Sequence, residues 1–189
     1  MGLRNRREER REGRRDEREA FGRRGSANHF QMQQKLVSIG DDYWIENDAG
    51  ERVYRVDGKA LRLRNTIDLE DAGGTKLCRI QTRVMHLRDT MDIEGPDGER
   101  IARVHKALIT PLRDRWKVDV EDGPDLKIQG NVVDHEYEIE DDDDRKVAEI
   151  SKRWFWLRDT YGVEIRPDQE PLLILAVTIA IDAMIHPDR

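Results

Sequence analysis

Apolar and polar residues alternate along most of this chain, in short segments separated by turn residues. The segments 43–46 (YWIE), 66–70 (TIDLE) and 90–94 (TMDIE) are clear examples. A period of two places alternate side chains on opposite faces of the backbone, which is typical of half-buried strands. Residues 71–74 (DAGG) and 95–98 (GPDG) have the composition of tight turns. The pattern therefore predicts a mainly β protein.

One short element recurs along the chain. Strong copies are LRNTIDLE, LRDTMDIE, LRDRWKVD and LRDTYGVE, and weaker ones are IGDDYWIE and VDHEYEIE. In chain order, the six copies begin at residues 39, 63, 87, 112, 133 and 157. A regular spacing of this kind indicates one supersecondary unit per repeat.

Each repeat is interpreted as a hairpin of two strands joined by a tight turn. The second strands are predicted at 52–56, 75–80, 99–104, 126–130 and 145–150. The last unit has no clear second strand. We expect residues 30–38 to pair with its first strand, which would close the sheet and remove its edges.

The C-terminal residues break the alternating pattern. Residues 172–185 are apolar except for Thr178 and Asp182, and Pro171 is well placed to begin a helix. This run is shorter than the roughly 20 residues of a membrane span. A helix that is apolar on all sides must be covered on all sides. We therefore predict a closed, roughly twelve-stranded antiparallel barrel, built from six hairpin-like repeats, with a buried apolar C-terminal helix through its centre.

Charge divides the chain into a tail and a body. Residues 1–28 hold ten Arg and six acidic residues, a net charge of +4, and almost no apolar residues. We expect this tail to be disordered and residues 29–189 to form the barrel domain. The formal net charge of the chain is −6, so the body carries −10. An acidic body argues against nucleic acid as a partner.

Cysteine content and targeting signals suggest a compartment. The chain has one cysteine, Cys78, so it can form neither an internal disulfide nor a cysteine-cluster metal site. No secretory signal or transmembrane segment is evident from the sequence. A cytoplasmic location is the simplest expectation.

Several short elements together resemble a known family. They are QQK at 33–35, DGK at 57–59, the repeated LRDT elements, QGN at 129–131, DHEY at 134–137 and SKRWFWLRDTY at 151–161. In this order they resemble the LURP-one-related family over roughly residues 31–186. The resemblance implies the tubby C-terminal-like fold, a twelve-stranded barrel around a central C-terminal helix. It implies little about function, although related folds include phosphoinositide-binding proteins and phospholipid scramblases.

The best candidate for binding is an aromatic and basic cluster after the repeat at 133–140. Its members are Lys152, Arg153, Trp154, Trp156 and Arg158. Aromatic side chains beside basic ones can lie at a lipid interface or grip a ligand. The alternative is that some of these side chains belong to the core, as most apolar side chains of a barrel do.

Other residues receive a structural interpretation. His135 is expected to be a hydrogen-bonded turn residue rather than a metal ligand, and residues 140–144 (EDDDD) a solvated hairpin turn. Cys78 is expected to be a core thiol. Ser151 beside Lys152 is interpreted as a strand end. The arginines of the repeated element are expected to pair locally: Arg64, Arg88, Arg113 and Arg158.

No motif for a catalytic nucleophile, a phosphate loop or a dinucleotide is present. We therefore predict a non-enzymatic protein without a cofactor or bound metal. The preferred hypothesis is a ligand-binding or membrane-peripheral module that recognises anionic phospholipid. The alternatives are a scaffold for a protein partner and a scramblase-like lipid-translocating protein, which would require the C-terminal helix to leave the barrel.

Overall fold

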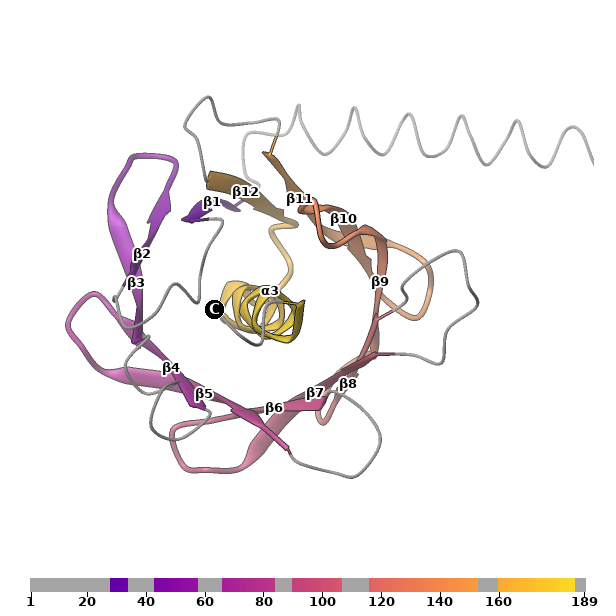
Figure 1. The fold of residues 1–189 in the computed structure, drawn as a ribbon, viewed down its shortest axis with the longest axis horizontal. Coiled ribbons are helices and arrows are strands. Elements are labelled where there is room, and N and C mark those ends of the chain that lie inside the picture. Colours follow the sequence, from indigo (N-terminus) through magenta and orange to yellow (C-terminus); the bar gives the residue numbers. More distant parts are fainter. Residues whose placement is uncertain are drawn as a thin grey trace, which may run out of the picture.

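The computed structural model describes residues 28–33, 43–57, 66–83, 90–106, 116–152 and 160–185. Within these ranges the chain forms a closed antiparallel barrel with one helix inside it (Figure 1). The strands are β1 (Asn28–Gln33), β2 (Tyr43–Asn47), β3 (Arg52–Asp57), β4 (Thr66–Asp71), β5 (Lys76–Thr82), β6 (Thr90–Glu94), β7 (Arg100–Lys106), β8 (Trp116–Val120), β9 (Leu126–Asn131), β10 (Glu136–Glu140), β11 (Lys146–Ser151) and β12 (Thr160–Ile165). The helix is α3 (Pro171–Ile185).

Closure of the barrel depends on the pairing of its first and last strands. β1 pairs antiparallel with β12 from Asn28, opposite Ile165, to Gln33, opposite Thr160. β1 also pairs with β2, and every other strand pairs with its neighbours in sequence. The predicted barrel, its closure by the N-terminal strand and its central helix are confirmed. Asn28 was predicted to belong to the disordered tail, but it is the first residue of β1. Residues 1–27 lie outside the described residues, so their predicted disorder stays a prediction.

The repeats curve the barrel in the same way. In four hairpins the register shifts between the last two residues of the repeated element, at Ile45/Glu46, Leu69/Glu70, Ile93/Glu94 and Ile139/Glu140. A bulge bends its strand and increases the local twist, so repeated bulges help the sheet to close. The turns follow at once. At one of them, the side chain of Asp71 accepts hydrogen bonds from the amides of Gly73 and Thr75, both at 2.8 Å.

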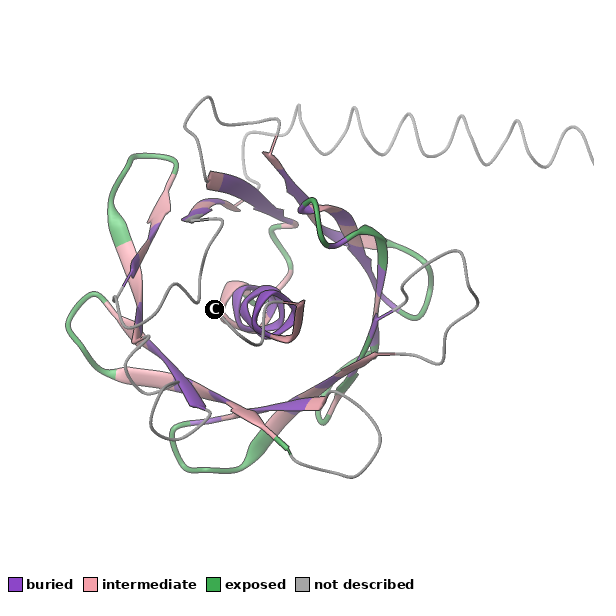
Figure 2. Cartoon of the chain, in the orientation of Figure 1, coloured by how far each residue is buried: buried purple, intermediate pink, exposed green. Residues whose placement is uncertain are grey.

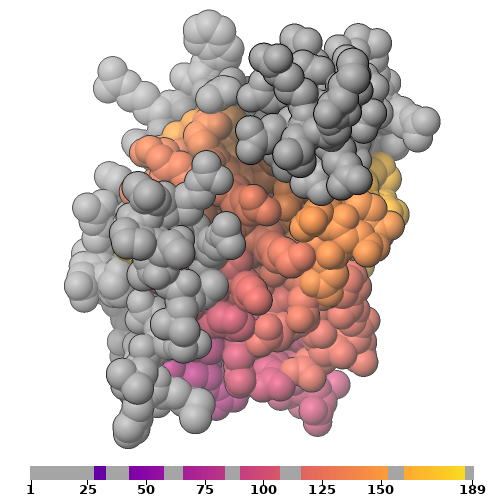
Figure 3. Space-filling model, turned by 90° about the vertical axis from the view of Figure 1, so that its right-hand side faces the viewer, coloured from indigo at the N-terminus to yellow at the C-terminus, as the bar shows by residue number. Residues whose placement is uncertain are grey.

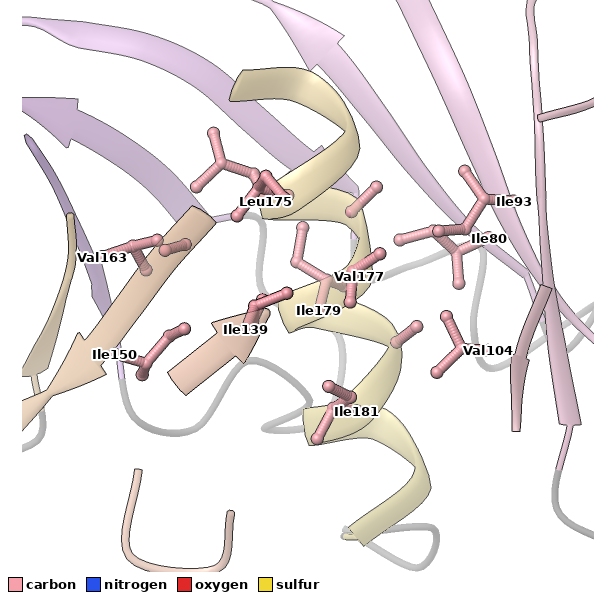
Figure 4. Packing of buried hydrophobic residues seen from close by; sticks show 14 of the residues in the cluster. Ile80, Ile93, Val104, Ile139, Ile150, Val163, Leu175, Val177, Ile179 and Ile181 are labelled. Atoms are coloured by element: carbon pink, nitrogen blue, oxygen red, sulfur yellow. The ribbon is translucent and has the colours of Figure 1, made fainter. Parts of the chain in front are cut away.

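The core consists of inward-facing strand residues and the helix. Side chains such as Ile80 and Ile93 approach the helix from one wall and Ile139 and Ile150 from another, and Leu175 belongs to the same cluster (Figure 4). Residues 174–183 of α3 are all buried (Figure 2). Figure 3 turns the side of the barrel that carries β8 to β10 toward the viewer.

Two polar side chains interrupt the apolar surface of the helix. Thr178 donates a hydrogen bond to the carbonyl oxygen of Ile174 at 2.9 Å. Asp182 lies 2.9 Å from Nε2 of His135, measured to Oδ1. His135 belongs to the β9–β10 turn and has a positive φ of 53°. Because the rest of the helix is apolar all round, we infer that this pair helps to set the rotation and depth of the helix in the barrel.

Gly130 is the glycine with the tightest surroundings. Its φ is +131°, and a Cβ atom there would lie 2.6 Å from the carbonyl oxygen of Glu136 and 2.7 Å from Cα of Tyr137. Both contacts are with the backbone of β10, so no side chain can move aside. The backbones of β9 and β10 therefore approach more closely here than a side chain at position 130 allows.

Gly130→Ala should lower the free energy of unfolding by about 2–3 kcal/mol, because both the backbone conformation and the missing space oppose a Cβ atom. Gly50→Ala is the matched control. Gly50 also has a positive φ, +72°, but no atom lies within 4 Å of the position that a Cβ atom would occupy there. Gly50→Ala should lower the free energy of unfolding by only about 1 kcal/mol. Urea unfolding measures both, and equal losses would contradict the steric argument.

His135→Ala should destabilise the protein by about 3–5 kcal/mol, because it leaves the carboxylate of Asp182 buried without its partner. The double variant His135→Ala/Asp182→Ala should recover part of this loss. A double-mutant cycle in urea, with Asp182→Ala as the second single variant, gives the coupling free energy. A coupling near zero would show that the pair does not hold the helix.

Candidate functional site

The structure describes one residue of the predicted aromatic and basic cluster, Lys152. Its backbone amide donates a hydrogen bond to Oε1 of Glu136 at 3.1 Å. The hydroxyl of Ser151 donates a hydrogen bond to Oε2 of the same carboxylate at 3.0 Å. Ser151 is the last residue of β11, as predicted. The other members lie outside the described residues: Arg153, Trp154, Trp156 and Arg158. Their role in binding stays a prediction.

Two structural interpretations from the sequence are confirmed, and a third is confirmed in part. Cys78 is fully buried, and burial and the charge of Asp68 raise the pKa of its thiol to about 12. The acidic turn is solvated at residues 142–144, but Glu140 and Asp141 are buried. Oδ1 of Asp141 accepts hydrogen bonds from the amides of Asp143 and Arg145, both at 3.0 Å. His135 is a hydrogen-bonded turn residue, although its partner lies on the helix. All four arginines of the repeated element lie outside the described residues, so their expected local pairing stays a prediction: Arg64, Arg88, Arg113 and Arg158.

Two further observations concern metals and membranes. Among the described residues, no three His, Cys, Asp or Glu side chains gather where they could hold a metal ion. In the same parts of the chain, no helix has both the length and the apolar character needed to cross a membrane.

The outer face of β4–β7 carries opposite charges that face each other across the strands. Asp68 stands opposite Arg79, and Asp92 opposite Arg103. Nε of Arg79 donates to Asp68 at 2.8 Å, and Nε of Arg103 donates to Asp92 at 2.7 Å. Asp92 also accepts a hydrogen bond from Arg83 at 2.9 Å. Such cross-strand pairs stabilise the sheet and fix the orientation of the guanidinium groups.

These pairs shift the pKa values of their carboxyl groups. Burial alone would raise the pKa of Asp92, but hydrogen bonds from Arg103 and Arg83 and their positive charges outweigh it, and the pKa is lowered. Asp68 has a lowered pKa for the same reasons, with Arg79 and Lys76 as its partners. Both aspartates therefore favour the ionised form in the folded protein.

A surface groove of about 500 Å³ opens beside this row of charges. Its lining residues are Thr82, Arg83, Asp92, Glu94, Gly98, Arg100 and Arg103. Three of them carry guanidinium groups and two carry carboxylates, so the lining has an excess of positive charge. The side chains of Arg83 and Arg100 are 46% and 40% exposed, whereas that of Asp92 is 3% exposed. The arginines thus face the solvent, and the aspartate that holds two of them lies behind.

The groove was missed by sequence reasoning, although the repeat contains a signal for it. Arg55, Arg79 and Arg103 occupy equivalent positions in successive second strands. Asp68 and Asp92 are likewise equivalent within the repeated element. The sequence prediction concerned the arginines of the repeated element and not those of the second strands. The ionic pairing across neighbouring strands becomes visible only when the register is known.

Comparison with known proteins agrees with this architecture. The family model described as LURP-one-related matches residues 28–182. An X-ray structure of a protein from Arabidopsis thaliana is similar, with a TM-score of 0.62 and 14% sequence identity, over 84% of this chain and 91% of that chain. At this identity the likeness concerns the fold alone. No curated protein matches the chain.

Acid should weaken the barrel through the paired aspartates. Because the folded-state pKa of Asp92 is lowered, its ionised form contributes stability that is fully present above the ordinary value of 3.8. That stability is lost as the pH falls through the lower folded-state pKa. Asp92→Asn should therefore be less stable than the unsubstituted protein at pH 7, by about 2 kcal/mol, and the difference should shrink below pH 3.8.

Urea unfolding between pH 7 and pH 2.5 measures this difference. Asp97→Asn, in the exposed turn between β6 and β7, is a control with the same chemical change. A difference between Asp92→Asn and the unsubstituted protein that stays constant with pH would contradict the ionic explanation.

Proposed function

This chain belongs to the LURP-one-related family, and from that premise we propose that it is a non-enzymatic binding module for an anionic group, foremost the headgroup of an anionic phospholipid. The observation that carries the proposal is the groove lined by Arg83, Arg100 and Arg103. We infer that the module acts in the cytoplasm, at the surface of a membrane.

Guanidinium chemistry supports an anionic ligand. A guanidinium has five N–H donors in a fixed fork that matches phosphate and carboxylate oxygens. Arg83 uses two donors on Asp92 and Glu94, and Arg103 uses two on Asp92. Asp92 already orients both arginine side chains. They would therefore lose less conformational entropy when a phosphate binds. The groove thus combines oriented donors with exposure to solvent.

Charge outside the groove adds to the same proposal. The body carries an acidic excess, so a local cluster of arginines is the kind of place where an anion would bind. The Arg-rich residues 1–28 would add weak, salt-sensitive attraction to an anionic membrane, reduced by their own six acidic residues. The cluster from Lys152 to Arg158 would form a second contact, with its aromatic side chains at the interface.

Flotation of the full-length protein with liposomes tests the proposal. Vesicles of zwitterionic lipid alone should not bind it, whereas vesicles containing anionic lipid should bind it at low salt and release it at high salt. Arg100→Glu should reduce the bound fraction severalfold, because it reverses one charge in the groove. Arg100 pairs with the exposed Glu121, so the substitution leaves the buried Asp92 pairs intact.

Arg52→Glu is the matched control. Arg52 is 62% exposed on β3, pairs with Glu46 and does not line the groove. It should bind vesicles much as the unsubstituted protein does. Equal losses in both variants would show that net charge, and not the groove, drives binding. No binding of the unsubstituted protein to any vesicle would overturn the lipid proposal and favour the alternative of a protein partner.

A further inference from the structure

Aromatic residues form a layer inside the barrel, near the C-terminal end of α3. The fifth position of the repeated element points inward in every unit and is buried. It is filled by Tyr43, Ile67, Met91, Trp116, Tyr137 and Tyr161. Three of the four aromatic residues are tyrosines, on β2, β10 and β12. The interior therefore has phenol groups on the arc of the barrel that runs from β10 through β12 to β2.

Asp182 on α3 lies among these tyrosines. Burial raises the pKa values of Tyr43 and Tyr161, and the negative charge of Asp182 raises them further, so both phenols stay protonated. Tyr137 feels the same charge and is hydrogen-bonded to Thr178, one helical turn before Asp182. The ring of His135 stacks on that of Tyr161, with 4.3 Å between ring centroids. The five side chains around Asp182 thus come from the helix, three strands and one turn.

Several polar atoms in this group have no hydrogen-bond partner in the protein. They are the hydroxyl oxygens of Tyr43 and Tyr161, Nδ1 of His135 and Oδ2 of Asp182. All four residues are at least 95% buried. More than nine in ten buried polar groups in proteins are hydrogen-bonded. Four exceptions around one carboxylate indicate that this part of the interior binds something polar.

The charge of the group specifies the kind of ligand. None of the buried residues in the described ranges is Lys or Arg. The titratable side chains inside the barrel there are His135, Tyr43, Tyr137, Tyr161, Cys78 and Asp182. Asp182 is thus the one acidic side chain inside the described part of the barrel, and no Lys or Arg accompanies it there. A buried carboxylate is costly unless a cation neutralises it.

We propose that Asp182, Tyr43, Tyr161 and His135 form an internal binding site for a small monovalent cation of the size of ammonium or potassium. The carboxylate supplies the charge, and the phenol oxygens and the free ring nitrogen supply neutral acceptors. Aromatic rings also attract a cation that lies over their faces. A divalent ion fits poorly, since calcium takes six to eight oxygen ligands and the site holds a single carboxylate.

Thermal unfolding of the full-length protein tests the proposal. The chlorides of ammonium, potassium, sodium and choline are compared at equal ionic strength, with choline as the cation too bulky for the site. Ammonium or potassium should raise the Tm by about 2–4 °C over choline. A rise with ammonium alone would indicate recognition by hydrogen-bond donation, and a rise with both would indicate recognition by charge and size.

Asp182→Asn removes the charge but keeps the shape, so it should abolish the difference between cations. Tyr161→Phe should reduce it, and it serves as the second variant if Asp182→Asn does not fold. Asp92→Asn, on the outer face, should leave the difference unchanged. Equal Tm values in all four salts, as expected if the site holds only water, would overturn the proposal. An Asp182→Asn variant with an unchanged cation difference would overturn it as well.

Discussion

The structure depends on the mutual burial of a helix and a barrel. A helix that is apolar all round needs cover on every side, and a barrel of this size needs a filler. Residues 174–183 of α3 are all buried by the strands around them. Neither part has an obvious way to be stable without the other, so the barrel and the helix are expected to fold as one unit. The pairing of β1 with β12 completes this arrangement, because it leaves no strand edge among the described residues.

The repeat distributes different tasks over its positions. Inward positions supply the core, the last two residues of the repeated element form the bulge in four hairpins, and outward positions carry the ionic pairs. The ionic pairs on the outer face stabilise neighbouring strands. They also hold arginines in fixed orientations beside the groove. This orientation of donors is the observation on which the proposed binding role rests.

The interior departs from the apolar rule at one place. His135 occupies a position of the repeated element where the other five copies have Asp or Asn. This exception reaches across the interior to Asp182, the only acidic residue of α3. Burial of such a pair costs free energy compared with apolar packing. Its presence among three tyrosines, with unpartnered atoms beside it, is the reason why we assign a binding role to this end of the barrel.

The strands, their repeat, the closure of the sheet and the helix from Pro171 to Ile185 were predictable from the sequence. These features follow from local periodicity and from the spacing of turn residues, which are properties of neighbouring positions. Which charged residues meet became known only from the folded arrangement of the strands and the helix. Asp92 meets Arg83 and Arg103 because of the strand register, and His135 meets Asp182 because the helix enters the barrel at a particular depth. Contacts between residues distant in the chain depend on register and depth, and an alternating pattern is the same for many registers.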